Sequence, residues 1–108
     1  MDKLINQTIY FNQLLEVYGE LLTSTQQEIL ESYYALNLSI SEISIERGIS
    51  RAAVEDTIKK GSRKLEFYEE KLSFVEKKTE ITKAINDLKE MNLSDEANEI
   101  IDFIEINL

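Results

Sequence analysis

Cysteine, histidine and proline are absent from this chain, and glycine occurs only three times. Without cysteine the chain has no disulfide, no thiolate metal site and no thiol nucleophile. Without histidine it also lacks the side chain most often used as a general base near neutral pH. Proline ends helices and glycine weakens them, so the scarcity of both predicts an all-α fold.

Long apolar runs are also missing. No segment approaches the roughly 18 apolar residues that a membrane-spanning helix needs, and the first ten residues, MDKLINQTIY, lack the apolar core of a signal peptide. We therefore expect a cytoplasmic protein with no membrane insertion. The chain has 108 residues, of which 43% are apolar and 31% charged. This composition predicts a single domain over residues 1–108, large enough for a hydrophobic core.

The motifs of common enzyme sites do not occur either. The sequence contains neither GxxxxGK[ST] nor GxGxxG, and its carboxylates show no metal-ligand spacing. The tyrosines have the positions of core aromatics with polar tips rather than of a catalytic site. They are Tyr10, Tyr18, Tyr33, Tyr34 and Tyr68. We predict that the protein is not an enzyme and binds no cofactor and no metal.

Charge is unevenly distributed along a chain whose net charge is -9. Residues 1–46 carry one lysine and seven acidic residues, a net of -6, and residues 65–108 carry five lysines and twelve acidic residues, a net of -7. Between them, residues 47–64 carry six Lys or Arg and two acidic residues, a net of +4. Any cationic binding function is therefore expected in this middle stretch.

Apolar residues at three- and four-residue spacing predict the first two helices. In the first they are Leu4, Phe11, Leu14, Leu15, Tyr18, Leu21 and Leu22. In the second they are Ile29, Leu30, Tyr33, Tyr34 and Leu36. Two pairs have the spacing of a capping box at the start of the second helix, Thr25 with Glu28 and Thr23 with Gln26.

Residues 40–60 have the pattern of a helix-turn-helix. Ser39 and Glu42 form a further capping-box pair, which starts a short helix at about 40–47 that presents Ile40, Ile43 and Ser44 inward. Gly48 ends this helix in a left-handed conformation.

The turn and the second helix of the motif follow directly. Ile49 is expected to fill the angle between the helices, Ser50 to cap the next helix, and Val54 to pack back onto the preceding one. This order of a turn glycine, an apolar residue, serine and a further apolar residue predicts a helix-turn-helix.

The second helix of the motif is predicted to continue without interruption from 51 to about 77. Its apolar positions alternate steps of four and three, as in a heptad seam. They are Val54, Ile58, Gly61, Leu65, Tyr68, Leu72 and Val75. Packing against the first helix is favoured over a coiled coil with a second chain, and Gly61 marks a bend or a close helix contact.

A helical hairpin is predicted at about 79–107, with Ser94 capping its second helix. The residues expected to line it are Ile81, Ala84, Ile85, Leu88, Ala97, Ile100, Ile101, Ile104 and Leu108. Phe103 lies off this stripe and is expected to face another element or subunit. The long helix and Phe103 are thus the two candidate surfaces for a homo-oligomer.

From Leu14 to Leu72 the chain resembles the YlxM-like proteins, small bacterial helix-turn-helix proteins similar to region 4 of RNA polymerase sigma factors. The resembling segments are LLEVYGELLT, ILESYYALNLSISEIS, GISRAAVEDTIKK and LEFYEEKL. The resemblance implies an all-α, sigma region 4-like helix-turn-helix fold. It also implies a link to the signal recognition particle pathway, because genes of this family tend to lie beside those of the particle's GTPase and its receptor.

Two departures from the family pattern are visible. Leu22, Thr23 and Ser24 stand where family members often have Leu-Thr-Pro, and Ser24 is expected to cap the helix instead. Ser44 stands where a helix-turn-helix usually has alanine. Its hydroxyl is expected to bond to the carbonyl of residue 40.

The early exposed positions of a recognition helix face the DNA groove, and here they include Arg51 but also the acidic Glu55 and Asp56. Arg51 suits guanine and a carboxylate can accept from cytosine, whereas adjacent carboxylates repel phosphates. The candidate nucleic-acid- or partner-binding residues are Arg47, Arg51, Ala52, Glu55, Asp56, Lys59, Lys60, Arg63 and Lys64.

Two functions follow as expectations. The first is a regulatory or accessory factor of the signal recognition particle pathway that acts by binding the particle's RNA or its GTPase. The alternative is a DNA-binding transcriptional regulator, whose contacts with DNA would be weak and salt-dependent because only about four cations reach the phosphates.

Overall fold

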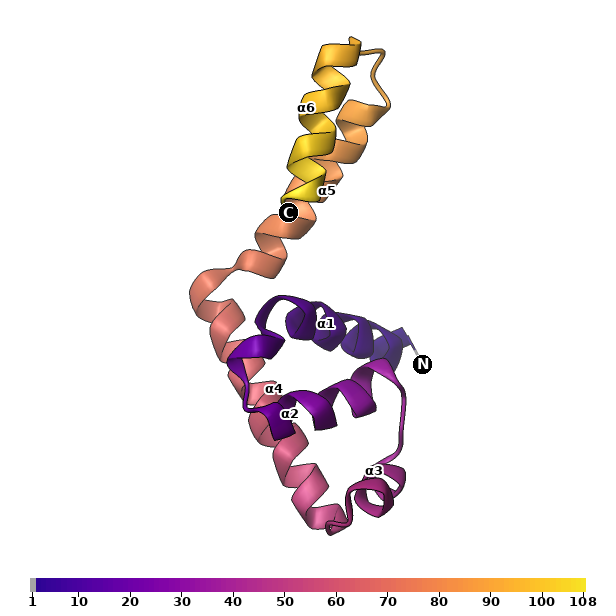
Figure 1. The fold of residues 1–108 in the computed structure, drawn as a ribbon, viewed down its shortest axis with the longest axis vertical. Coiled ribbons are helices and arrows are strands. Elements are labelled where there is room, and N and C mark those ends of the chain that lie inside the picture. Colours follow the sequence, from indigo (N-terminus) through magenta and orange to yellow (C-terminus); the bar gives the residue numbers. More distant parts are fainter. Residues whose placement is uncertain (1) are drawn as a thin grey trace. The chain divides into compact units, whose positions relative to one another are not determined.

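The computed structural model describes residues 2–108, with side chains from residue 6 onward. Helices joined by short turns make up this part of the chain, as predicted, and the side chain of Leu4 lies outside what is described. The elements are α1 (Asp2–Tyr18), η1 (Gly19–Leu21), α2 (Ser24–Leu30), η2 (Glu31–Ala35), α3 (Ile40–Arg47), α4 (Arg51–Leu72), α5 (Phe74–Lys89) and α6 (Asp95–Ile106) (Figure 1).

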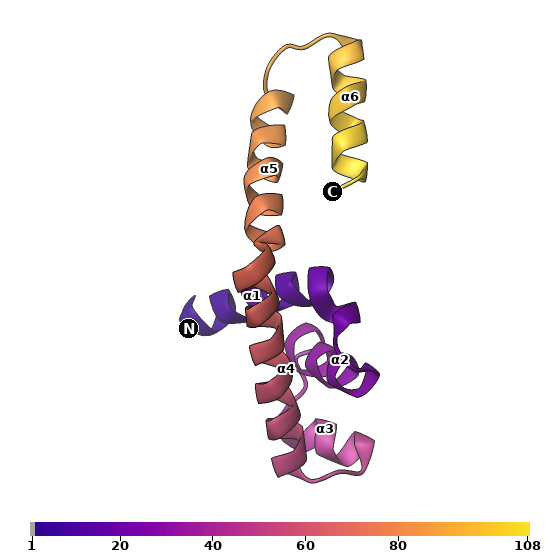
Figure 2. The same cartoon turned by 90° about the vertical axis from the view of Figure 1, so that its left-hand side faces the viewer.

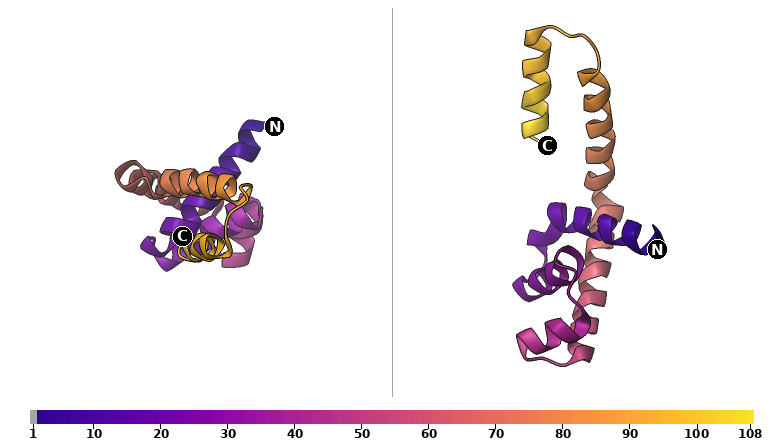
Figure 3. Two further views of the ribbon diagram at one scale, coloured as in Figure 1. Left: turned by 90° about the horizontal axis from the view of Figure 1, so that it is seen from above. Right: turned by 90° about the vertical axis from the view of Figure 1, so that its right-hand side faces the viewer.

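The helices form two compact units, residues 1–72 and residues 73–108. In the first unit, α1, α2 and α3 all pack on α4, with α1 crossing it (Figure 2). In the second unit, α5 and α6 lie side by side as a hairpin (Figure 3). The prediction that residues 1–108 behave as one domain stays a prediction.

The core of the first unit consists mainly of apolar side chains from α1, α2, α3 and α4. The largest fully buried side chains are Leu14, Tyr18, Ile29, Leu30, Ile43, Val54 and Leu65. Two hydroxyls anchor the aromatic part of this core. Tyr18 donates to Glu69 at 2.6 Å, and the hydroxyls of Tyr34 and Ser62 are 2.9 Å apart. Buried polar tips thus have partners, as close-packed interiors require.

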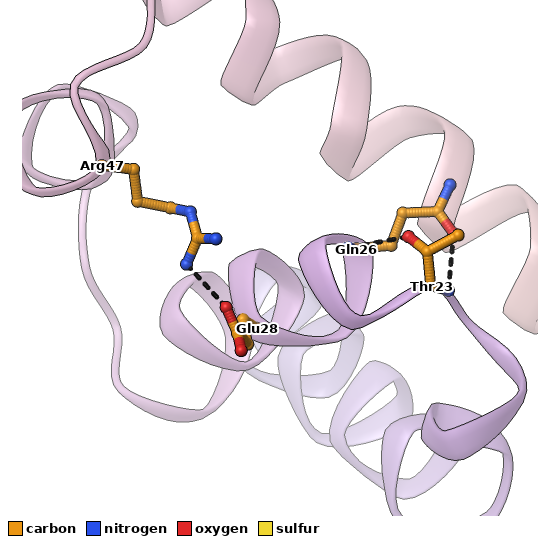
Figure 4. Close-up of polar contacts among 4 residues, drawn as sticks. All are labelled: Thr23, Gln26, Glu28 and Arg47. Carbon is orange, nitrogen blue, oxygen red and sulfur yellow. Dashed lines mark hydrogen bonds and ion pairs between the residues drawn. The ribbon is translucent and has the colours of Figure 1, made fainter.

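The start of α2 resolves the two capping alternatives in favour of Thr23 and Gln26. The Thr23 hydroxyl accepts from the Gln26 amide at 3.2 Å, and the Gln26 side chain accepts from the Thr23 amide at 3.3 Å (Figure 4). The expectation that Ser24 is the cap is wrong, because Ser24 is already the first helical residue.

Changes of helix type shift two predicted core residues to the surface. The α-helical hydrogen bonding of α1 ends at Tyr18, and the tighter turn of η1 leaves Leu21 55% exposed. The continuation of α2 is the π-helix η2, which widens the turn and leaves Leu36 68% exposed. Both residues were predicted on apolar stripes that assume a constant 3.6-residue turn.

The prediction of one helix from 51 to about 77 is wrong. Helix α4 ends at Leu72, Ser73 adopts a left-handed conformation with φ 55°, and α5 begins at Phe74. The hairpin accordingly starts at 74 rather than at about 79. Four seam positions, Val54, Ile58, Gly61 and Leu65, are buried within the first unit, so that part of the seam packs against its own chain.

The hairpin has a small buried interior. Of the residues predicted to line it, only Ile85 and Ile101 are buried, and Lys89 and Glu105 join the two helices by an ion pair at 2.6 Å. Ser94 caps α6 as predicted, accepting from Ala97 at 3.2 Å. Phe103 is 66% exposed, and its role in an oligomer stays a prediction.

Gly61 lies at a close helix contact, the second of the two alternatives. A Cβ at this position would lie 2.8 and 2.9 Å from the two methyl groups of Leu30, which is fully buried. Alanine would therefore have to displace a packed side chain of α2.

Gly61→Ala is expected to lower the free energy of unfolding by about 1 kcal/mol. Overpacking costs about 1–3 kcal/mol, and the better helix propensity of alanine offsets about 1 kcal/mol of it. Denaturant unfolding of Gly61→Ala, Leu30→Ala and the double variant measures this. Leu30→Ala makes room for the new methyl group. The double variant should therefore lose less stability than the two single variants lose when their losses are added. A Gly61→Ala variant more stable than wild type would contradict the close contact.

Candidate nucleic-acid or partner interface

The turn between α3 and α4 has the geometry of a helix-turn-helix. Gly48 is left-handed with φ 65°, and the amide of Ile49 donates to the carbonyl of Ser44 at 3.1 Å, which is the Schellman arrangement. Ser50 then caps α4 by accepting from Ala53 at 3.0 Å. Together with the fully buried Val54, these bonds fix the direction in which α4 leaves the turn.

Two details of the turn differ from expectation. Ile49, which was expected to fill the angle between the helices, is 38% exposed and is not part of the buried core. The Ser44 hydroxyl donates to the carbonyl of Ser41 at 2.8 Å, one residue later than the predicted residue 40. Its bond is nevertheless made inside the unit, so serine is accommodated at this buried position.

The first turns of α4 present Arg51, Ala52, Glu55 and Asp56 to solvent, as the sequence predicted. Asp56 forms an ion pair with Lys60 at 3.0 Å, and both side chains are mostly exposed. A pair of this kind contributes little stability, so it can exchange for other contacts. The tip of α4 therefore displays two carboxylates beside one guanidinium group.

Arg47 has a contact within the fold. Its guanidinium donates to the Glu28 carboxylate at 2.9 Å and so joins α3 to α2 (Figure 4). An external anion would have to compete with Glu28 for this group. A binding role for Arg47 stays a prediction.

Three of the predicted cations come together in an open hollow beside α2, which we call the basic groove. Its volume is about 750 Å³, and it is lined by Gln26, Lys60, Arg63, Lys64, Phe67 and Tyr68. No acidic side chain is among these lining residues. The basic groove thus offers three cations and an aromatic surface to a ligand, although one of the cations, Lys60, is already paired with Asp56 at the tip of α4.

Lys59 lies apart from the basic groove although it neighbours Lys60 in sequence. At 100° per residue, Lys59 shares a strip of α4 with Glu55 and Glu66, four residues before it and seven after it. Glu69 lies three residues beyond Glu66 on the same side of α4, and both glutamates lie near Tyr10 of α1. Burial raises the pKa of the Tyr10 hydroxyl, and the negative charges of the two nearby glutamates raise this pKa further. Lys60, Arg63 and Lys64 therefore lie on one flank of α4, and Lys59 lies on the other, which carries Glu55, Glu66 and Glu69 and which we call the acidic flank.

Comparison of the sequence with known protein families identifies the family of this chain. Residues 5–104 match the family described as "Putative helix-turn-helix protein, YlxM / p13 like". The chain belongs to this YlxM/p13-like family. The resemblance seen in the sequence and the helix-turn-helix fold are thereby confirmed.

Relatives of this YlxM/p13-like chain cover most of its length. The YlxM protein of Bacillus subtilis is 40% identical over 102 residues, which are 94% of this chain and 93% of that protein. A UPF0122 protein of Fusobacterium nucleatum is 37% identical over 99 residues, 92% of this chain and 96% of the relative. One from Caldanaerobacter subterraneus is 45% identical over 82 residues, 76% and 70% of the two chains.

Sequence reasoning missed Gln26, Phe67 and Tyr68 as lining residues of the basic groove. Phe67 follows Lys60 by seven residues and Lys64 by three, so the pattern of α4 alone could have placed it beside these lysines. Gln26 had no such signal, because its place depends on how α2 packs on α4. The site of this YlxM/p13-like chain is thus a joint feature of two helices.

No helix within residues 2–108 has the length and apolar character needed to cross a membrane. Over the same residues, no cluster of acidic side chains is arranged to hold a metal ion.

Proposed function

We propose that this YlxM/p13-like chain is a cytoplasmic accessory factor of the signal recognition particle pathway that acts by binding the particle's RNA or its GTPase. The link to the pathway comes from the family resemblance. The observation that carries the binding role is the basic groove, where Lys60, Arg63 and Lys64 gather beside an exposed aromatic ring.

The charge distribution favours a small contact surface rather than a long interface with a duplex. The chain carries a net charge of -9, and exposed charges act over a Debye length of about 8 Å at physiological ionic strength. The acidic flank and the carboxylates at the tip of α4 would repel a duplex laid along the helix. A ligand that enters the basic groove meets three cations and no lining carboxylate, and it competes with Asp56 for Lys60 alone.

Binding of purified protein to the particle's RNA and, separately, to its GTPase tests the proposal. We expect micromolar or tighter binding of at least one of them, or a changed rate of GTP turnover, at low salt. Lys64→Ala should weaken this binding and reduce its salt dependence by about one counterion. Lys59→Ala removes the same charge from the opposite flank and should bind like wild type.

Two outcomes would count against the proposal. One is the absence of both binding and any change in turnover at micromolar concentrations. The other is an equal effect of Lys59→Ala and Lys64→Ala, which would show that only net charge matters and that the basic groove is not the contact surface.

A DNA-binding transcriptional regulator is the second candidate. The observation that favours it is the helix-turn-helix geometry itself, with Arg51 and Ala52 exposed at the start of α4. Arg51 would then read guanine in the major groove. A DNA sequence selected from random pools and bound at nanomolar concentration at physiological salt would make this function the better one.

A further inference from the structure

Phe67 is an apolar ring placed among cations. It is 53% exposed, and the ammonium of Lys71 lies 5.7 Å from the centre of its ring. Tyr68 meets the ring edge-on, with the centroids 6.1 Å apart, which supports its orientation. A large aromatic side chain left in solvent and surrounded by positive charge is an unusual surface feature that a flat, anionic ligand would cover.

The spacing along α4 sets this ring next to the charges. Lys60, Lys64, Phe67 and Lys71 follow one another at steps of four, three and four residues, so they form one strip of the helix. At 1.5 Å per residue, Lys64 and Lys71 flank Phe67 by about 5 and 6 Å along the axis. Arg63 lines the same groove, and Gln26 adds an amide that can donate and accept.

We propose that the basic groove binds unpaired nucleotides of a single-stranded nucleic acid, with a base stacked on Phe67 and the flanking phosphates held by Lys60, Arg63 and Lys64. Proteins that bind single strands combine a cationic track for the backbone with aromatic rings for the bases. The proposal rests on the proposed function and deepens it, because it names the part of an RNA that the protein would contact.

The exposed ring of Phe67 favours unpaired nucleotides over a duplex. In a duplex the faces of the bases are stacked on one another and cannot reach a protein ring. An unpaired base exposes its face, as in the loops and bulges that RNA-binding proteins recognise.

A tryptophan at position 67 gives a direct probe of stacking. The chain contains no tryptophan, so Phe67→Trp supplies a single indole fluorophore in the basic groove. Titration with ten-nucleotide single-stranded RNA or DNA at about 50 mM salt should quench its emission with saturation. A blunt duplex of the same length should quench it several-fold less. Phe103→Trp, with its ring exposed on α6, is the matched control and should not respond.

Phe67→Ala separates stacking from charge. It should weaken single-strand binding about tenfold or more and leave the salt dependence of the affinity unchanged. Lys64→Ala should instead reduce that salt dependence. Since Phe67 is half exposed, the alanine variant should melt like wild type, which circular dichroism checks.

Three outcomes would overturn the inference. They are equal quenching by single strand and duplex, wild-type affinity of Phe67→Ala, and no binding of any oligonucleotide. If the particle's RNA or GTPase still binds in those cases, only the stacking inference fails and the proposed function stands. If oligonucleotides stack on position 67 but neither the RNA nor the GTPase binds, the proposed function fails and the inference stands.

Discussion

Val54→Asp is expected to unfold the helix-turn-helix unit. Val54 is fully buried on the inner face of α4, and among the described side chains no Lys or Arg is buried in the core to pair with a new carboxylate. Burying an unpaired charge costs about 4 kcal/mol or more, even when the group takes up a proton. Since a domain of this size is stable by only about 5–15 kcal/mol, we expect a large loss of helical circular dichroism or a fall in melting temperature of well over ten degrees.

Ala53→Asp is the matched control for this prediction. Ala53 is exposed, one residue earlier in the first turn of α4, where a negative charge interacts favourably with the helix dipole. Its melting temperature should equal or slightly exceed that of wild type. A Val54→Asp variant that melts like wild type would show that α4 is not packed on α3 in solution.

The double change Glu55→Arg and Asp56→Gln is expected to raise the affinity for random duplex DNA about tenfold or more at 50 mM salt. It removes both carboxylates from the tip of α4, adds one cation, and releases Lys60 from its 3.0 Å ion pair with Asp56. Each additional phosphate contact steepens the salt dependence by about 0.9. Fluorescence anisotropy across a salt series should therefore show tighter binding that disappears as salt increases.

Glu96→Arg with Asp102→Gln is the control for net charge. These two exposed acidic residues belong to α6, and their replacement changes the charge by the same amount in the other unit. Equal gains from both double variants would mean that the acidic residues at the tip have no local effect. Tight, sequence-selective DNA binding by wild type at physiological salt would contradict the prediction outright and favour the transcriptional regulator.

Local rules predicted the helix-turn-helix well because its signals lie close together in the sequence. The capping box of Ser39 and Glu42 forms at 3.0 and 3.1 Å, Gly48 is left-handed, and Val54 is buried. The residues that give these signals all lie within the short stretch 39–54. The same rules could not choose between Thr23 and Thr25 as the cap of α2, since both have an acceptable partner three residues later.

The basic groove could be predicted only in part. Sequence placed Lys59, Lys60, Arg63 and Lys64 in one cationic cluster, whereas the structure puts Lys59 on the acidic flank of α4 and the other three beside α2. Which flank faces α2 depends on how far α4 is rotated about its axis. That rotation is set by core contacts such as Gly61 against Leu30, between residues 31 positions apart.

The sequence by itself determined that the chain is helical, that residues 40–60 form a helix-turn-helix, and that cations concentrate near α4, because helix propensity, capping and charge are local properties. Tertiary structure decided that the long helix ends at Leu72 and that the buried Val75 belongs to the second unit. The apolar spacing continues through this break unchanged. Such spacing predicts that a residue is buried but not which partner buries it, so it could not reveal the end of the helix. Tertiary structure also brought Gln26 and Phe67 to one groove, since only the packing of α2 on α4 joins them.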